Sequence, residues 1–78
     1  MKVGTVTGSV WATRKASCLQ GQTFLVVRTE YDEVVAADCV GAGAGDCVLV
    51  VLGATARYYC DNAPVDAAVV AIVDTKKE

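Results

Sequence analysis

The strongest hydrophobic signal in the chain is an unbroken apolar run over residues 48–52. A glycine-alanine segment, residues 41–45, precedes this run and Gly53 follows it. Consecutive valine and leucine residues between glycines are typical of a strand buried on both faces, because a strand with one face in water would alternate with polar residues. We therefore predict a central strand at 46–52, with the other elements arranged to cover it.

The first strand is predicted over residues 2–13, where polar and apolar positions alternate imperfectly. Val6 and Val10 share a face with two glycines, and the opposite face carries threonine and serine. Glycine kinks of this kind let a strand bend around a small barrel. Trp11 falls on the polar face, where we expect a barrel-end or subunit-contact residue. A base-stacking surface would normally combine several aromatic residues with basic ones.

Three further strands complete the predicted sheet. We predict strands at 23–28 and 34–38, joined by an acidic turn, and a last, continuously apolar strand at 65–74. Residues 53–60 permit one or two helical turns, too short to be stable without tertiary support. Five glycine-kinked strands with one short helix before the last predict an all-β fold, a small and mostly antiparallel β-barrel that forms a single domain over residues 1–78.

Composition changes this picture in one respect, because the chain is more apolar than a small domain needs. Hydrophobic residues make up 54% of the 78 residues, and the mean hydropathy is +0.41. A domain of this size buries only roughly 60–65% of its unfolded surface. No run approaches the roughly 18–20 residues of a membrane-spanning helix, and no signal-peptide pattern follows Met1. We therefore expect oligomerisation, without a membrane, to bury the excess apolar surface.

Charge and candidate chemistry argue against nucleic acid and against catalysis. The formal net charge is −2, and histidine, the commonest general base and metal ligand, is absent. Paired carboxylates such as Asp38 and Asp46 could serve acid–base chemistry, but aspartates at strand ends are more often turn and cap residues. The segment 41–45 lacks the lysine and serine of a phosphate-binding loop, and it precedes a strand instead of following one. We predict no catalytic residues, no cofactor and no metal.

The four cysteines of the chain have long and irregular spacing without a C-x-x-C motif, which does not fit a structural zinc site. Two disulfides would need an oxidising compartment, and no secretory signal supports one. We expect all four to be small buried hydrophobic residues of a cytosolic protein. They are Cys18, Cys39, Cys47 and Cys60.

Three blocks of the chain carry a family resemblance. They read VGAGAGDCVLVVLGATAR in the middle, GTVTGSVWATRKASCLQGQTFLVV near the N-terminus and PVDAAVVAIVD near the C-terminus. In this order they resemble the signature blocks of the EutN/CcmL family, the vertex proteins of bacterial microcompartments. The chain differs from the family pattern at Ala54, where relatives have serine, at Ala71, where they have glycine, and in a shorter connection over 29–33.

The resemblance implies an OB-like barrel that assembles into a cyclic homopentamer. Such a ring caps the five-fold vertices of a polyhedral shell around encapsulated enzymes. The implied partners are further copies of the chain and hexameric or trimeric shell proteins, in the bacterial cytoplasm. The alternative for an OB-like barrel is a nucleic-acid-binding module, which would need exposed aromatic and basic residues on the second and third strands. Those strands instead offer Phe24 in an apolar run and an acidic hairpin.

Two sets of residues are candidates for roles in such a ring. We expect Gly53, Ala54 and Thr55 to line an opening on the five-fold axis, with Arg57 supporting them through hydrogen bonds or an ion pair. Helix N-termini that point at the axis would favour anions there. The candidates for contacts with other subunits or shell proteins are Arg14, Lys15, Gly41, Gly43, Gly45 and Arg57.

Overall fold

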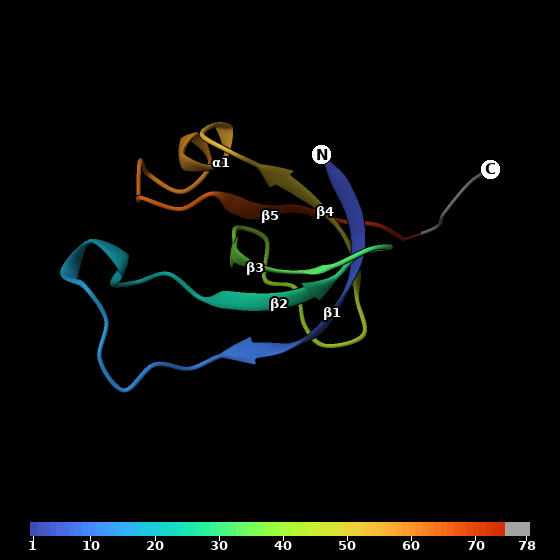
Figure 1. Ribbon diagram of the computed structural model, residues 1–78, viewed down its shortest axis with the longest axis horizontal. Helices are drawn as coiled ribbons and strands as arrows, with labels where there is room; N and C mark the ends of the chain where they lie inside the picture. Colours follow the sequence, from blue (N-terminus) through green and yellow to red (C-terminus); the bar gives the residue numbers. More distant parts are fainter. Residues whose placement is uncertain (75–78) are drawn as a thin grey trace.

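The computed structural model describes residues 1–74, which contain five strands closed into a barrel (Figure 1). The strands are β1 (Lys2–Val10), β2 (Phe24–Arg28), β3 (Glu33–Asp38), β4 (Cys47–Leu52) and β5 (Ala67–Ile72). The short helix α1 (Thr55–Tyr58) lies between β4 and β5, and a turn of 3-10 helix (Ser17–Leu19) precedes β2. The predicted fold class is confirmed.

The strands follow the order β1-β2-β3-β5-β4 around the barrel. Neighbouring strands are antiparallel apart from β3 and β5, which run parallel. A parallel pair cannot be joined by a tight hairpin, so the chain passes through β4 and α1 between these two strands. This crossover places the end of β3 beside β5, where Asp38 pairs with Val69.

The barrel interior is built mainly of valine and alanine. Val48 and Val50 of β4 have no exposed surface, and the remaining residues of this strand are buried or half-buried. Cys47 and Leu49, which alternate with these valines, are only half-buried, so the single chain covers the inner face of the strand fully and its outer face in part. A second, smaller cluster of buried residues packs beneath α1 and includes Ala56 and Cys60.

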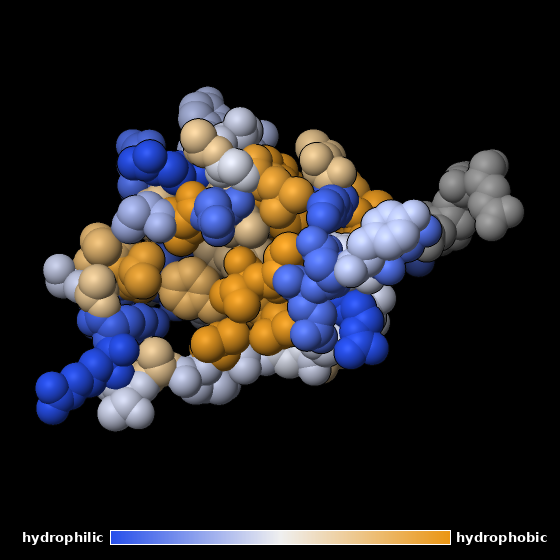
Figure 2. Space-filling model, in the orientation of Figure 1, coloured by the Kyte–Doolittle hydropathy of each residue, from blue (hydrophilic) through white to orange (hydrophobic). Residues whose placement is uncertain are grey.

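Much apolar surface nevertheless stays exposed on the single chain. Trp11 and Tyr31 are each 89% exposed, and Tyr58 is 81% exposed. Figure 2 shows hydrophobic residues gathered over β2, β3 and β5 in the middle of one face, with hydrophilic residues toward both ends. Within residues 1–74 no helix is both long and apolar enough to cross a membrane. The apolar excess expected from composition thus lies on the outside of the barrel.

Candidate functional site

Two aspartates fix the hinge, residues 41–45, at its two ends. The Oδ1 atom of Asp38 accepts hydrogen bonds from the amides of residues 40–42, at 3.1, 3.1 and 3.3 Å. The Oδ2 atom of Asp46 accepts one from the amide of Gly43 at 2.8 Å. Both carboxylates therefore serve as caps of a turn, which is the role that the sequence favoured over acid–base chemistry.

The hinge glycines face open space within the single chain. Gly41 and Gly45 have φ angles of +77° and +92°, in a region that other residues rarely adopt. A Cβ atom added at either glycine or at Gly43 would meet nothing within 4 Å. Any close approach that these glycines permit is therefore to another molecule. Their role in subunit or shell contacts stays a prediction.

The segment predicted to line a pore forms the turn from β4 into α1. Its Gly53 amide donates a hydrogen bond to the carbonyl of Asp66 at 2.8 Å, which ties the turn to the start of β5. An open groove of about 490 Å³ lies here, and its lining residues are Gly53, Ala54, Arg57, Pro64, Val65 and Asp66. The structure thus brings three of the four candidate residues together, whereas Thr55 is exposed outside the groove.

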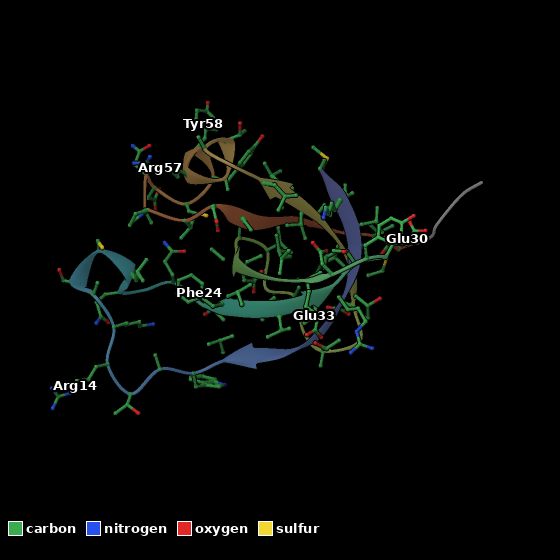
Figure 3. The ribbon with its side chains drawn as sticks, in the orientation of Figure 1. Arg14, Phe24, Glu30, Glu33, Arg57 and Tyr58 are labelled. Atoms are coloured by element: carbon green, nitrogen blue, oxygen red, sulfur yellow. The ribbon has the colours of Figure 1, made fainter. Side chains whose placement is uncertain are left out.

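Arg57 lies at the edge of this groove, on the outer side of α1. Figure 3 shows its side chain projecting from the barrel near Tyr58. Among the described residues the ion pairs are Lys2–Asp32 and Arg28–Glu33, so the ion pair expected for Arg57 does not form within residues 1–74. The helix has only four residues and no side-chain cap, and the predicted preference for anions at its N-terminus stays a prediction.

Arg14 and Lys15 lie on the arm, the connection of residues 11–23 between β1 and β2. The arm projects from one end of the barrel (Figure 1), and Arg14 lies at its tip (Figure 3). Lys15 is engaged within the chain: its Nζ donates to the carbonyl of Gln22 at 3.2 Å and lies 5.9 Å from the centre of the Phe24 ring. Of the two basic residues, Arg14 is the one that points away from the barrel.

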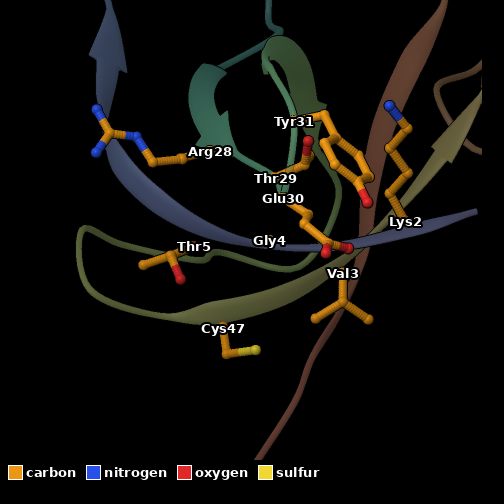
Figure 4. Close-up of a pocket in the computed structure, with 9 residues that line it drawn as sticks. All are labelled: Lys2, Val3, Gly4, Thr5, Arg28, Thr29, Glu30, Tyr31 and Cys47. Carbon is orange, nitrogen blue, oxygen red and sulfur yellow. The ribbon is translucent and has the colours of Figure 1, made fainter.

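A larger groove of about 780 Å³ was not predicted from the sequence. It lies between the start of β1 and the turn that joins β2 to β3 (Figure 4). Its lining residues are Lys2, Val3, Gly4, Thr5, Arg28, Thr29, Glu30, Tyr31 and Cys47. The one available sequence signal was Tyr31, an aromatic residue within an otherwise acidic turn.

A local network stabilises the turn beside this groove. The hydroxyl of Thr29 donates to the carboxylate of Asp32, and Lys2 forms an ion pair with the same carboxylate at 3.2 Å. The Thr29 hydrogen bond, followed by the bond from Lys2, holds the pKa of Asp32 below its ordinary value. The turn thus carries a fixed negative charge at neutral pH.

The prediction that all four cysteines are buried is wrong. Cys60 is buried and Cys47 is half-buried, but Cys18 and Cys39 are exposed. The two exposed residues lie in the arm and just after β3, segments that run over the surface and leave both residues open to solvent. Within residues 1–74 no group of three or more metal-ligating side chains is present.

These features define a class of protein, a small closed β-barrel whose polar and aromatic residues lie on outer surfaces suited to assembly. The chain belongs to the EutN/CcmL family: the family model described as ethanolamine utilisation protein EutN/carboxysome matches residues 1–74. The resemblance found in the three sequence blocks is therefore confirmed.

Individual relatives cover nearly the whole chain. The chain is similar to the carboxysome shell vertex protein CcmL of Synechococcus elongatus, with 45% identity over 86 residues, 96% of this chain and 85% of that protein. It is 42% identical over 89 residues to the microcompartment shell vertex protein PduN of Salmonella typhimurium, covering 96% of this chain and 97% of that one. Its structure resembles the pentameric microcompartment shell protein GrpN from Rhodospirillum rubrum with a TM-score of 0.88, 39% identity and coverage of 100% and 99% of the two chains.

Proposed function

We propose that this chain is a structural shell protein of a bacterial microcompartment, whose homopentamer caps the five-fold vertices of the shell in the bacterial cytoplasm. The observation that carries the proposal is the match, over 100% of the chain, to a pentameric microcompartment shell protein. Two sequence relatives, CcmL and PduN, are shell vertex proteins. The role is one of assembly and not of catalysis.

The surface of the single chain supports assembly on physical grounds. Trp11, Tyr31 and Tyr58 expose most of their rings, and aromatic residues are enriched in the cores of protein interfaces. A head-to-tail interface whose rotation closes after five copies forms a ring without a free edge. Closure therefore lets each barrel bury two different faces against identical neighbours.

Within this ring, the turn from Gly53 to Thr55 lines the axial opening, with Arg57 beside it. The groove beside this turn then lies near the axis in every copy. Arg14, at the tip of the arm, and Lys15 contact a neighbouring subunit or an adjacent hexameric or trimeric shell protein. The glycines of the hinge permit a close approach by the same kind of neighbour.

The nucleic-acid alternative finds no support on the strands that would carry it. Phe24 is half-buried and covered by Lys15, and the exposed side chains of β2 and β3 include Glu33 paired with Arg28 at 3.4 Å. A surface that stacks bases needs free aromatic rings beside free cations. The two strands do not combine these features.

Light scattering behind a sizing column, in reducing buffer, tests the oligomeric state. We expect one species with five times the 8.1 kDa mass of the chain. A monomer that persists at all concentrations and binds oligonucleotides would contradict the proposed function.

A structure of the assembled ring with Thr55→Trp tests the axial assignment separately. We expect the bulky side chain to narrow the axial opening, whereas Thr13→Trp, on the arm, should leave it unchanged. An opening of the same width in both variants would refute the assignment of the turn from Gly53 to Thr55.

A further inference from the structure

Two cysteines from distant parts of the sequence meet beside α1. Cys39 directly follows β3 and Cys60 lies just beyond the helix, and their Sγ atoms are 3.5 Å apart. The Cys39 amide donates to the carbonyl of Val69 on β5 at 3.1 Å, and the Cys60 amide donates to the carbonyl of Arg57 at 3.1 Å. Backbone hydrogen bonds to β5 and to the helical turn therefore hold the two thiols together.

We propose that Cys39 and Cys60 form a dithiol modification site, which a small-molecule disulfide oxidises to an intrachain disulfide. The S–S bond of a disulfide is about 2.05 Å long, so the two sulfur atoms need to approach by about 1.5 Å. Rotations of the two short side chains supply a movement of this size. This site is independent of the vertex function and does not require the ring.

The different exposure of the two thiols sets the order of the reaction. Cys39 is exposed, whereas Cys60 is only 3% exposed. The Cys39 thiolate attacks one sulfur of the external disulfide, which breaks that S–S bond and releases one external thiol. Cys60 loses its proton to solvent and attacks the Sγ of Cys39, which releases the second external thiol. The two protein thiols are thereby oxidised, and one external disulfide is reduced to two thiols.

The surroundings of Cys39 make this site slow at neutral pH. The residue as a whole is exposed, but its Sγ points at Cys60 and lies 3.3 Å from the carbonyl oxygen of Tyr59. The partial burial of this atom, followed by its hydrogen bond with Cys60, raises the pKa of the Cys39 thiol to about 11. Because the thiolate is the attacking species, the reaction should speed up about tenfold per pH unit between about pH 7 and 9.

The sequence allows the disulfide to be located without ambiguity. Trypsin cleaves after Arg57 and thereby separates residues 29–57, which contain Cys39, from residues 58–76, which contain Cys60. Cys47 lies in the same peptide as Cys39, so the test protein carries Cys47→Ser, and Cys18→Ser removes the exposed thiol of the arm. The parent chain, with all four cysteines, is tested beside it.

The folded, assembled protein is incubated with oxidised glutathione, acidified, alkylated and digested with trypsin. We expect the two peptides to be joined, with loss of the mass of two hydrogen atoms and of both free thiols. Adding Cys60→Ser should stop the reaction at a glutathione adduct on Cys39. With Cys39→Ser instead, the buried thiol of Cys60 should stay unmodified.

Two results would overturn the proposal. One is a stable glutathione adduct on Cys39 in the protein that retains Cys60. The other is a linked peptide that forms only in urea, and not in the folded protein.

The melting temperature gives a second measurement, because the disulfide closes a loop over residues 39–60 and should raise Tm by roughly 10 °C. An oxidised protein that melts no higher than the reduced one would contradict a link formed in the native geometry.

Discussion

Replacing Gly4 of β1 with alanine places a methyl group against atoms of β2. A Cβ atom at this position would lie 2.6 Å from the carbonyl oxygen of Arg28 and 2.6 Å from Cγ1 of Val27. The carbonyl belongs to the backbone and cannot rotate away, so one strand has to shift. Overfilling a close-packed interior in this way costs about 1–3 kcal/mol of unfolding free energy.

Gly8, on the same strand, provides a matched control. A Cβ atom added there would meet nothing within 4 Å, and neither glycine has a positive φ angle. Gly8→Ala should therefore leave the unfolding free energy unchanged or raise it by about 0.4–1 kcal/mol, because alanine lowers the entropy of the unfolded chain. In a domain of this size about 1 kcal/mol shifts Tm by about 4–8 °C, so Gly4→Ala should melt about 4–24 °C lower than the parent.

Urea unfolding, followed by far-ultraviolet circular dichroism, measures both variants. All samples need the same protomer concentration, because assembly adds to the apparent stability. The expected result is a lower midpoint for Gly4→Ala at an unchanged m value, with Gly8→Ala at or above the parent. If Gly8→Ala lost as much stability as Gly4→Ala, strand flexibility and not the close approach would be the function of these glycines.

Substitutions at three other positions test further parts of the structure. Val50→Ala removes both γ-methyl groups from a side chain with 0% exposure. It should lower the unfolding free energy by about 2–3 kcal/mol in the same urea assay. A loss below about 0.5 kcal/mol would contradict the position of Val50 in the core. Asp38→Ala removes the acceptor of the amides of residues 40–42 and should speed their hydrogen exchange, whereas Asp38→Asn, which keeps Oδ1, should restore most of the protection. Because the pKa of Asp32 is lowered in the folded state, its contribution to stability is complete above the ordinary value of 3.8 and is lost as the pH falls through the folded value. Asp32→Asn should therefore flatten the fall of Tm between about pH 5 and 2, and an unchanged slope would refute this role.

The approximate positions of the strands were predictable because they follow from local backbone preferences of the residues. The exact ends of the strands depend on hydrogen bonding to the neighbouring strands. The first strand was expected to reach residue 13, yet it ends at Val10, which pairs with Phe24, the first residue of β2. The last strand likewise begins at Ala67 because its partner Leu52 is the end of β4. A strand stops where its neighbour stops, and the residues of one segment do not contain that information.

For the candidate site too, the sequence was sufficient for residues that are close along the chain, but not for residues that only the fold brings together. Gly53, Ala54 and Arg57 line one groove because they are close in the sequence, so a local pattern was sufficient to group them. The contact between Cys39 and Cys60 instead depends on the parallel pairing of β3 with β5, and spacing alone gave no sign of it. The small size of cysteine indicated burial, but exposure is decided by where the surface segments of the chain lie.

The core and the outer surface of this barrel contain different kinds of apolar residue. Valine and alanine fill the interior, whereas Trp11, Tyr31, Tyr58 and Tyr59 are at least half exposed. A small valine-rich core supplies limited stability, since a domain of this length buries a modest share of its surface. Four of the five aromatic side chains therefore lie where a neighbouring molecule can cover them. This distribution leaves aromatic surface uncovered on a chain whose own core is small, and it makes assembly a source of stability as well as of function.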